Sequence, residues 1–497
     1  MGVGSQRIAV MLGVTLALTG VRAQSACPDA GMVERQVRYG PDSPGFLAAV
    51  DTDDRLGVGV AEIGDIDGDG IPDIALGAPN VDDGGPARGT VWIVFPLSDG
   101  RTRSTQRISS PSQGGLMSPL SGDANFGFGI DGIGDLDGDG VPDMVVGAPG
   151  DDAAGTDRGS VLVLFLNRDG TVKNEVKIHV GDRASVGARF GTGVACLGDL
   201  DGDGTLEVAI GSPTEDLRQR DDGAVWIVSL DRTGRAVRWL LIGPGQGGFG
   251  GAVAQDDRFG NSVGGGEDID SDGVPDLVVS ARLDDASNPD AGAVYVVLLN
   301  PDGTAKSDTK ITEGFGGFMG DLDAREEFGS AVDFLPDVDG DGTPDMAVGT
   351  WLDTDGGGVR GSVWVMLLES DGRVRDWQKL SQSEGGLLEP LQSSSRMGWG
   401  VSAASRDDEG RIRLLAGVST ADYKGLIGCG SVWLFSLTTC QPCLADLDGD
   451  GTLTLFDFLV FQGLFSLGDL RADFDGDGEL TVFDFLAFQN TFSVGCP

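Results

Sequence analysis

Short apolar runs, separated by clusters of glycine, aspartate and proline, recur along most of the chain. In the first instance they lie at residues 58–63, 74–78 and 91–95 and are rich in Val, Ile and Trp. Runs of this length bounded by turn-forming residues are typical of strands. A fourth, weaker strand is expected after each set of three, at residues 105–109, 175–180, 237–242, 308–312 and 376–380.

This pattern repeats in steps of 64 to 70 residues. Each unit opens on an aromatic or other apolar residue followed by glycine, and the units begin at Leu56, Phe126, Phe190, Phe259, Phe328 and Met397. Four antiparallel strands per unit form the blade of a β-propeller. The predicted fold is therefore all-β, a six-bladed propeller, with seven blades as the alternative.

The two ends of the repeat array predict how the ring closes. The sixth unit offers three strands, the last at residues 432–437, and residues 34–40 look like the isolated fourth strand of a unit. Pairing between these two segments would complete the sixth blade. It would also remove the open sheet edges that invite aggregation.

An acidic loop follows the first apolar run of the unit. Asp65, Asp67, Asp69 and Asp73 stand at positions 1, 3, 5 and 9 of this loop, with Gly70 at position 6. Oxygen ligands at alternate positions, with a glycine that permits a sharp turn, suit a hard cation of the size of Ca²⁺. No histidine or cysteine accompanies them, which argues against zinc or copper.

The acidic loop recurs in four further units and is lost in the sixth. The matching residues are Asp135, Asp137, Asp139 and Asp143; Asp199, Asp201, Asp203 and Glu207; Asp268, Asp270, Asp272 and Asp276; and Asp337, Asp339, Asp341 and Asp345. One such set could be a solvated turn. Five in the same register predict about five bound Ca²⁺ ions, because four carboxylates packed together without a cation would repel one another.

The sequence pattern changes after Cys443. Two copies of a longer acidic loop follow, spaced 27 residues apart. Each has carboxylates at positions 1, 3, 5 and 12, as in an EF-hand loop. They are Asp446, Asp448, Asp450, Asp457, Asp473, Asp475, Asp477 and Asp484. A helix is expected to start at each position 12. This region is therefore predicted to be a small α-helical unit that binds two further Ca²⁺ ions.

The repeats resemble FG-GAP repeats, as found in the propeller of integrin α chains and in many bacterial surface proteins. The resemblance covers residues 34–440 and depends on the Phe-Gly pairs, the acidic loops and the Gly-Ala-Pro segments at residues 77–79 and 147–149. It implies structural rather than catalytic calcium, and partners that dock on the face opposite the loops. Integrin propellers have seven blades, whereas six units are counted in this chain.

Residues 443–497 resemble a dockerin, of the type with flanking cysteines found in planctomycete-like exported proteins. The resemblance implies docking onto a cohesin-like partner through a helical face. The candidate contact residues are Phe458, Leu459, Phe461, Phe485, Leu486 and Phe488. The alternative is that most of them form the core, because so small a unit must bury its aromatic residues.

The first 23 residues predict a secretory signal peptide, with Arg7 before an apolar run and a small-residue cleavage pattern. The propeller is assigned to residues 27–440. Six cysteines in an exported chain favour disulfides. Cys443 and Cys496 are expected to pair, and Cys27 with Cys440 is a plausible second pair. The state of Cys196 and Cys429 is left open.

Net charge and the shortage of histidine limit the possible functions. The formal charge is −43, and 28 of the 78 acidic residues lie in the seven loops, so seven divalent ions would leave about −29. That remainder opposes binding to nucleic acid or to an anionic membrane. His179 is the only histidine, which nearly excludes a Ser-His-Asp triad. The conspicuous carboxylates are already assigned to calcium.

The predicted function is a secreted, non-catalytic, calcium-stabilised binding or adhesion protein, with the propeller as scaffold for a protein or glycan ligand and the dockerin as tether. The alternative is a carbohydrate-active enzyme or substrate-targeting subunit of a dockerin-organised complex. Trp351 and Trp399 interrupt the repeat and either stack on sugars or pack between blades. A further set in one equivalent strand position is expected in the core: Trp92, Trp226, Trp364 and Trp433.

Overall fold

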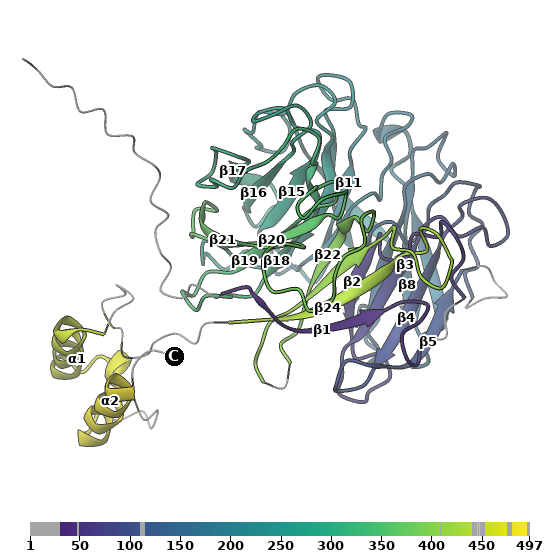
Figure 1. Cartoon of the computed structure of the whole chain (residues 1–497). Coiled ribbons are helices and arrows are strands. Elements are labelled where there is room, and N and C mark those ends of the chain that lie inside the picture. Colours follow the sequence, from purple (N-terminus) through teal and green to yellow (C-terminus); the bar gives the residue numbers. More distant parts are fainter. Residues whose placement is uncertain are drawn as a thin grey trace, which may run out of the picture.

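The structure is a computed structural model, and it describes residues 30–46, 49–109, 115–407, 409–439, 445, 447, 453–474 and 480–494. These residues form a six-bladed β-propeller followed by two short helices (Figure 1). Each blade is one antiparallel sheet of four strands, in which neighbours along the chain are neighbours in the sheet. The prediction of six blades is confirmed.

The strands of blades 1 to 3 are β2 (Val60–Gly64), β3 (Asp73–Ala78), β4 (Thr90–Pro96) and β5 (Thr102–Ile108); β6 (Ile130–Gly134), β7 (Asp143–Ala148), β8 (Ser160–Leu166) and β9 (Val172–Ile178); and β10 (Val194–Gly198), β11 (Leu206–Ser212), β12 (Ala224–Leu230) and β13 (Ala236–Ile242). A 3₁₀ turn, η1 (Gly181–Arg183), follows β9.

Blades 4 and 5 are β14 (Phe259–Gly265), β15 (Leu277–Ala281), β16 (Ala293–Leu299) and β17 (Ala305–Ile311); and β18 (Phe328–Leu335), β19 (Asp345–Thr350), β20 (Ser362–Leu368) and β21 (Val374–Leu380). Blade 6 consists of β22 (Met397–Ala404), β23 (Arg413–Val418), β24 (Ser431–Leu437) and β1 (Val33–Tyr39).

The fourth strands begin up to three residues earlier than predicted. β5, for example, starts at Thr102, and Thr102 pairs with Pro96 beyond a register shift. The first residues of these strands are mostly polar and exposed, so an apolar run cannot reveal them, yet their backbone groups still pair with the third strand.

The N-terminal strand closes the ring, as predicted. β1 pairs antiparallel with β24, from Val33 opposite Leu437 to Tyr39 opposite Val432, and Figure 1 shows the two strands side by side. The Tyr39 hydroxyl also donates to the carbonyl of Gly100 in blade 1, at 2.9 Å. Closure therefore joins the sixth blade to both ends of the repeat array.

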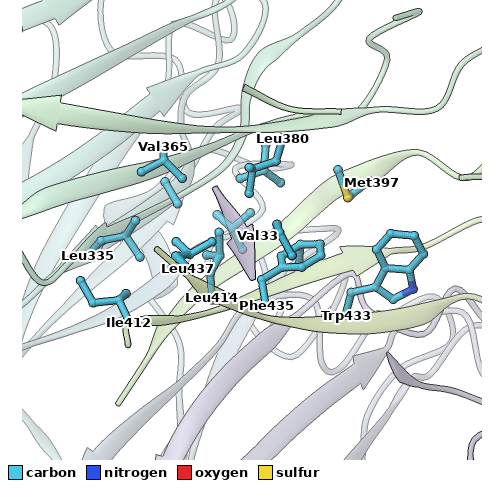
Figure 2. Close-up of a cluster of buried hydrophobic side chains, with 14 of the residues drawn as sticks. Val33, Leu335, Val365, Leu380, Met397, Ile412, Leu414, Trp433, Phe435 and Leu437 are labelled. Carbon is cyan, nitrogen blue, oxygen red and sulfur yellow. The ribbon is translucent and has the colours of Figure 1, made fainter. Parts of the chain in front are cut away.

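The hydrophobic core lies between blades. One cluster combines residues of blades 5 and 6 with Val33 of β1, and Figure 2 shows Leu335, Val365 and Phe435 converging there. The four tryptophans expected in the core are at most 6% exposed, which confirms that prediction. Because each interface uses side chains from two blades, no blade can bury its apolar surface alone.

Glycine is required where successive blades touch. A Cβ on Gly77 of the first Gly-Ala-Pro segment would lie 1.9 Å from the carbonyl oxygen of Gly127, which belongs to the Phe-Gly pair of the next blade. The same contact recurs at 1.8 to 2.0 Å for Gly147, Gly211, Gly349 and Gly417. Both glycine positions of the repeat are therefore explained by backbone-to-backbone packing.

The C-terminal region contains helices α1 (Leu455–Leu467) and α2 (Val482–Val494), with η2 (Leu470–Ala472) between them. The helices begin two residues before Asp457 and Asp484, so the prediction that they start at position 12 was wrong by that distance. Asp457 is instead the third helical residue, and with Thr454 it forms a capping box. No helix among the described residues is long and apolar enough to cross a bilayer.

Candidate metal centres in the acidic loops

The acidic loops connect the first and second strands of blades 1 to 5. Their carboxylates gather as the spacing predicted: one oxygen from each of three residues lies within 4.8 Å of the others in every loop. Positions 1, 3 and 9 meet in blades 1, 2, 4 and 5, and positions 1, 3 and 5 meet in blade 3, where position 9 is the longer Glu207. Five clusters of hard oxygen ligands thus lie on one end of the ring.

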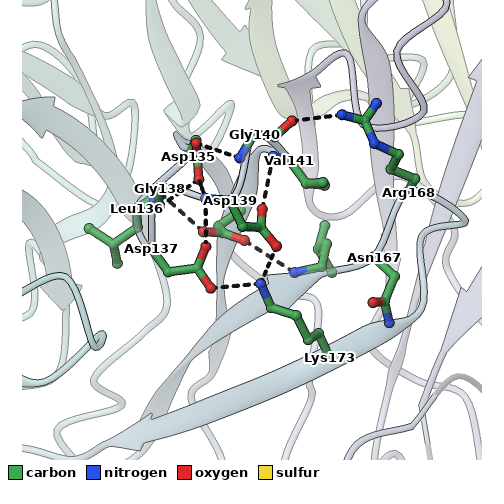
Figure 3. A network of polar contacts seen from close by, with 12 residues as sticks. Asp135, Leu136, Asp137, Gly138, Asp139, Gly140, Val141, Asn167, Arg168 and Lys173 are labelled. Carbon is green, nitrogen blue, oxygen red and sulfur yellow. Dashed lines mark hydrogen bonds and ion pairs between the residues drawn. The ribbon is translucent and has the colours of Figure 1, made fainter.

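The residue at position 1 organises the loop backbone. In blade 2, Asp135 accepts hydrogen bonds from the backbone N–H groups of Gly138, Asp139 and Gly140 at 2.8 to 2.9 Å (Figure 3). Equivalent bonds to position 1 occur in the other four loops. Hydrogen bonds of the protein itself therefore hold the loop backbone around its first carboxylate.

The carboxyl group at position 9 is buried in each of the five loops. Asp143 is fully buried, and its two oxygens accept from the N–H groups of Leu136 and Leu166 at 3.1 Å. Burial raises the pKa of Asp143 to about 6, and it raises the pKa values of Asp73 and Asp276 to about 7. Burial also raises the pKa of Asp345 well above its usual range. A divalent cation would stabilise the ionised form of these carboxylates.

A basic residue from the fourth strand completes each loop, and sequence reasoning missed it. Lys173 Nζ lies 2.6 Å from Asp137 Oδ2 and also pairs with Asp139 (Figure 3). The equivalent residues Arg103, Lys306 and Arg375 bridge positions 3 and 5 of their loops. In blade 3 the equivalent residue is Val237, and the next residue, Arg238, lies 3.6 Å from Asp201. The common register of Arg103, Lys173, Lys306 and Arg375 in the fourth strand was the available signal.

A second set of buried carboxylates lies after the second strand and was also missed. Asp151, Asp284 and Asp353 are at most 1% exposed, and each pairs at 2.5 to 2.6 Å with a fourth-strand lysine, namely Lys177, Lys310 and Lys379 respectively. These pairs fix the second connection of the blade to its outer strand. They are structural, because each buried charge has its own counter-ion.

Blade 6 holds its first hairpin with arginines instead of an acidic cluster. Arg411 Nε donates to Asp407 Oδ2 at 2.9 Å, and Arg413 donates to Glu62 of blade 1, also at 2.9 Å. Arg406 donates to the backbone carbonyls of Gly410 and Asp337. No carboxylate cluster that could hold a metal is found in the described part of this hairpin.

Two further carboxylates face the axis of the ring from opposite blades. Asp131 of blade 2 accepts from Cys196 N at 2.7 Å, and Asp333 of blade 5 accepts from Ala403 N at 2.9 Å, so each joins its blade to the next. Burial raises the pKa of Asp131 to about 7, and burial together with Asp131 raises the pKa of Asp333 to about 8.

The C-terminal loops are described only in part. Asp457 and Asp484 are buried and accept from backbone N–H groups on both sides of their loops. Asp473 is described as well, whereas the remaining predicted ligands, Asp446, Asp448, Asp450, Asp475 and Asp477, lie outside the described residues.

The six predicted aromatic and leucine contact residues of the helices divide into three kinds. Phe461 and Phe488 are 1% exposed and stack on each other with centroids 4.3 Å apart. Phe458 and Phe485 are partly buried against them, whereas Leu459 and Leu486 are about half exposed. Sequence reasoning missed four exposed apolar residues beside these leucines: Leu455, Phe456, Val482 and Phe483.

Of the six cysteines, the structure describes only Cys196 and Cys429, whose state the sequence left open. Cys196 and Cys429 are free thiols, and burial raises the pKa of Cys196 to about 12. Cys27, Cys440, Cys443 and Cys496 lie outside the described residues, so the two proposed pairings stay predictions.

The comparisons with known proteins follow the same repeats. A family model for the FG-GAP repeat matches residues 61–94, 127–164, 190–228 and 259–297, in blades 1 to 4. Integrin alpha pat-2 of Caenorhabditis elegans is 31% identical over 229 residues, which cover 44% of this chain and 17% of that protein. Integrin alpha-V of Gallus gallus is 32% identical over 236 residues, covering 46% and 20%. The matched region thus spans no more than a fifth of these relatives.

Proposed function

We propose that this chain is a secreted, non-catalytic binding or adhesion protein whose propeller presents a ligand-binding surface and whose acidic loops hold structural Ca²⁺. The observation that carries the proposal is the fivefold recurrence of one carboxylate cluster in a propeller similar to that of integrin α chains. Five copies of one arrangement stiffen five hairpins. An active site would need only one.

The donor set supports Ca²⁺ at these loops. Carboxylates at positions 1, 3 and 5 and the buried carboxylate at position 9 would supply hard oxygen ligands, with a backbone carbonyl at position 7. Each carboxylate has two oxygens, so the fourth-strand lysine or arginine can hold one oxygen of position 3 while a cation takes the other. We expect five ions in the propeller and two in the C-terminal loops.

The C-terminal helices support a tether of the dockerin type. Leu455, Phe456 and Leu459 of α1 occupy the same positions as Val482, Phe483 and Leu486 of α2, and all six are 51 to 69% exposed. Two equivalent apolar surfaces on so small a unit suit a partner that covers one of them. We propose a cohesin-like protein as that partner.

Calorimetry of the full chain with and without calcium, followed by binding assays, tests this function. Calcium should raise the melting temperature, and the loaded protein should bind extracellular protein ligands or glycans on an array without releasing reducing sugar. Sugar release from a bound glycan would overturn the non-catalytic proposal. A melting temperature that did not respond to calcium would overturn the structural role of the loops.

A separate binding experiment tests the tether. Phe456→Ala combined with Phe483→Ala should weaken binding to immobilised cohesin modules by at least about tenfold, because both equivalent surfaces lose their largest side chain. Ile427→Ala, which truncates an exposed apolar residue of the propeller, is the matched control. Equal binding by the double variant and the control would contradict the proposed surface.

A further inference from the structure

The departures from the repeat converge at one end of the ring axis. In the segments equivalent to the first Gly-Ala-Pro segment, residues 77–79, the third residue is proline in blades 1 to 3 but Arg282 in blade 4 and Trp351 in blade 5. The third residue of the sixth unit is Trp399. The rings of Trp351 and Trp399 meet edge to face, with centroids 3.9 Å apart, so they pack together across the junction of blades 5 and 6.

A glutamate ties these departures into one cluster. Glu327 forms an ion pair with Arg282 and accepts from the indole N–H of Trp351 at 2.8 Å. Arg282 Nε also donates to the side-chain oxygen of Asn261 at 2.9 Å. Blades 4, 5 and 6 are therefore linked by side chains that the other three blades lack.

Arginines surround this cluster at a position shared by every blade. The residue immediately before the opening pair of each unit has φ between 52° and 61°. It lies where the chain turns into the inner strand. The six residues at this position are Arg55, Asn125, Arg189, Arg258, Glu327 and Arg396. The acidic loops lie at the other end of the antiparallel strands. Four arginines in this ring of six are unexpected in a chain of net charge −43.

The guanidinium groups of these four arginines form no salt bridge with the residues that the structure describes. Within the described residues, no ion pair or hydrogen bond involves the guanidinium group of Arg55, Arg189, Arg258 or Arg396, whereas that of Arg282 has both, through Glu327 and Asn261. The Nε atom of Arg258 is buried without a hydrogen-bond partner. Buried guanidinium N–H groups are normally paired, so this atom lacks an acceptor that a ligand could supply.

The arginines also repel one another. Burial and the neighbouring Arg55 lower the pKa of Arg396, and burial and Arg258 lower that of Arg282, in both cases despite the opposing effect of Glu327. An anion between them would relieve this repulsion. Arginine binds a carboxylate through two parallel hydrogen bonds, which favours carboxylate over a spherical anion.

The aromatic pair argues against a sugar as the occupant. Stacking on a sugar needs an open ring face, but the Arg396 guanidinium lies 4.8 Å from the Trp351 ring centroid and Trp399 packs against the same ring. The axial cavity, which Asn261, Ser330 and Trp399 help to line, has a volume of about 60 Å³. That volume holds only a few water molecules, so a ligand must bind at the mouth.

We propose that Arg55, Arg258, Arg282, Arg396, Trp351 and Trp399, here called the mouth cluster, bind a carboxylate side chain in an acidic segment of a protein partner. The inference rests on the proposed binding function and adds the chemical class of its ligand. Arg55, Arg258 and Arg396 supply guanidinium groups that form no salt bridge with a described residue. Glu327 holds Arg282 in place, and Trp351, packed on Trp399, holds the Arg396 guanidinium against its ring.

Binding of fluorescein-labelled poly-L-glutamate to the full chain in calcium, followed by anisotropy, tests the proposal. Arg55→Gln combined with Arg396→Gln should weaken binding about tenfold or more, and Arg258→Gln alone should weaken it by a smaller factor. The control is Arg232→Gln with Arg373→Gln, which removes the same charge from two exposed residues at the acidic-loop end. Added salt should weaken wild-type binding.

Equal losses in the mouth variant and the control would overturn the proposal, because they would show a response to net charge alone. Arg258→Gln keeps the test valid if the double variant folds poorly, which its melting curve in calcium would reveal. Binding of polygalacturonate but not of poly-L-glutamate would overturn the assignment to a protein ligand. If a protein ligand identified for the wild type still binds the mouth variants normally, the inference fails while the binding function stands.

Discussion

Blades 2 and 6 solve the same structural problem with different chemistry. The first hairpin of blade 2 gathers Asp135, Asp137 and Asp143 around a position for a cation, whereas that of blade 6 ties its backbone with Arg406 and Arg411. Both hairpins connect equivalent inner strands of the ring. The comparison teaches that the hairpin needs local positive charge, which either an ion or a guanidinium group can supply.

Removing calcium from the whole protein is the strongest test of that difference. Chelation by EDTA should lower the melting temperature by about 10 °C or more, because the five hairpins would lose the proposed ion, which binds only the folded state. Differential scanning calorimetry at several calcium concentrations would measure it. Blade 6 offers no such cluster in its described residues, so at most five propeller ions should be counted by titration.

Arg413→Ala should produce the next largest effect, and one that calcium does not change. Arg413 and Glu62 join blades 6 and 1 at 2.9 Å with 12% and 15% of their side chains exposed. Truncation removes the counter-ion of the Glu62 carboxylate and leaves it with hydrogen bonds from Ser405 alone, which should cost about 3 kcal/mol. Denaturant unfolding in calcium and in EDTA would show equal losses; a loss confined to one condition would contradict an ion-independent seam.

Asp143→Asn should remove one loop from the calcium response. If calcium is present at about 100 times the dissociation constant of the site, losing the site costs about 2.7 kcal/mol. In EDTA the cost should shrink to that of one backbone N–H, of Leu136 or Leu166, that the amide nitrogen cannot accept. The matched control is Asp407→Asn in blade 6, which weakens an ion pair with Arg411 and should cost about 1 kcal/mol with or without calcium. Equal calcium responses of the two variants would show that blade 2 binds no ion through Asp143.

The regularity of the repeat explains how much of the fold and of the acidic loops could be predicted from the sequence. Periodic apolar runs predicted the blades and the closing strand, and the one-residue spacing of aspartates predicted the loop clusters, because both depend on residues close together in the chain. The pairs Lys173 with Asp137 and Lys177 with Asp151 depend on the register between strands. That register follows from the turns and pairing of the whole blade, which a single segment does not reveal.

The mouth cluster and the helical surfaces were missed for related reasons. Arg55 and Arg396 are far apart in the sequence and become neighbours only when the ring closes. The exposure of Phe456 and Phe483 depends on where each helix begins, and the predicted start lay two residues too late. Trp351 and Trp399 were recognised as departures from the repeat, but their contact requires two blades in place.

The smallest expected effect concerns the axial carboxylates and depends on pH. The pKa values of Asp131 and Asp333 are raised to about 7 and about 8, so the folded state binds more protons than the unfolded state between about pH 4 and pH 8. Their contribution to stability is therefore present below pH 4 and is lost as the pH rises through 7 and 8. Cys196 beside Asp131 stays neutral over this range, since its own pKa is about 12.

Asp333→Asn should remove part of this loss, because an amide stays neutral while its oxygen can still accept from Ala403 N. The variant should match the wild type near pH 5 and exceed it at pH 8.5 by roughly 1 kcal/mol, a small value because the carboxyl group lines a cavity large enough to admit water that would screen its charge. Unfolding at both pH values, with calcium saturating, measures the difference. A variant that is less stable than wild type at pH 8.5 would show that the ionised carboxylate bridges blades 5 and 6 better than a neutral group does.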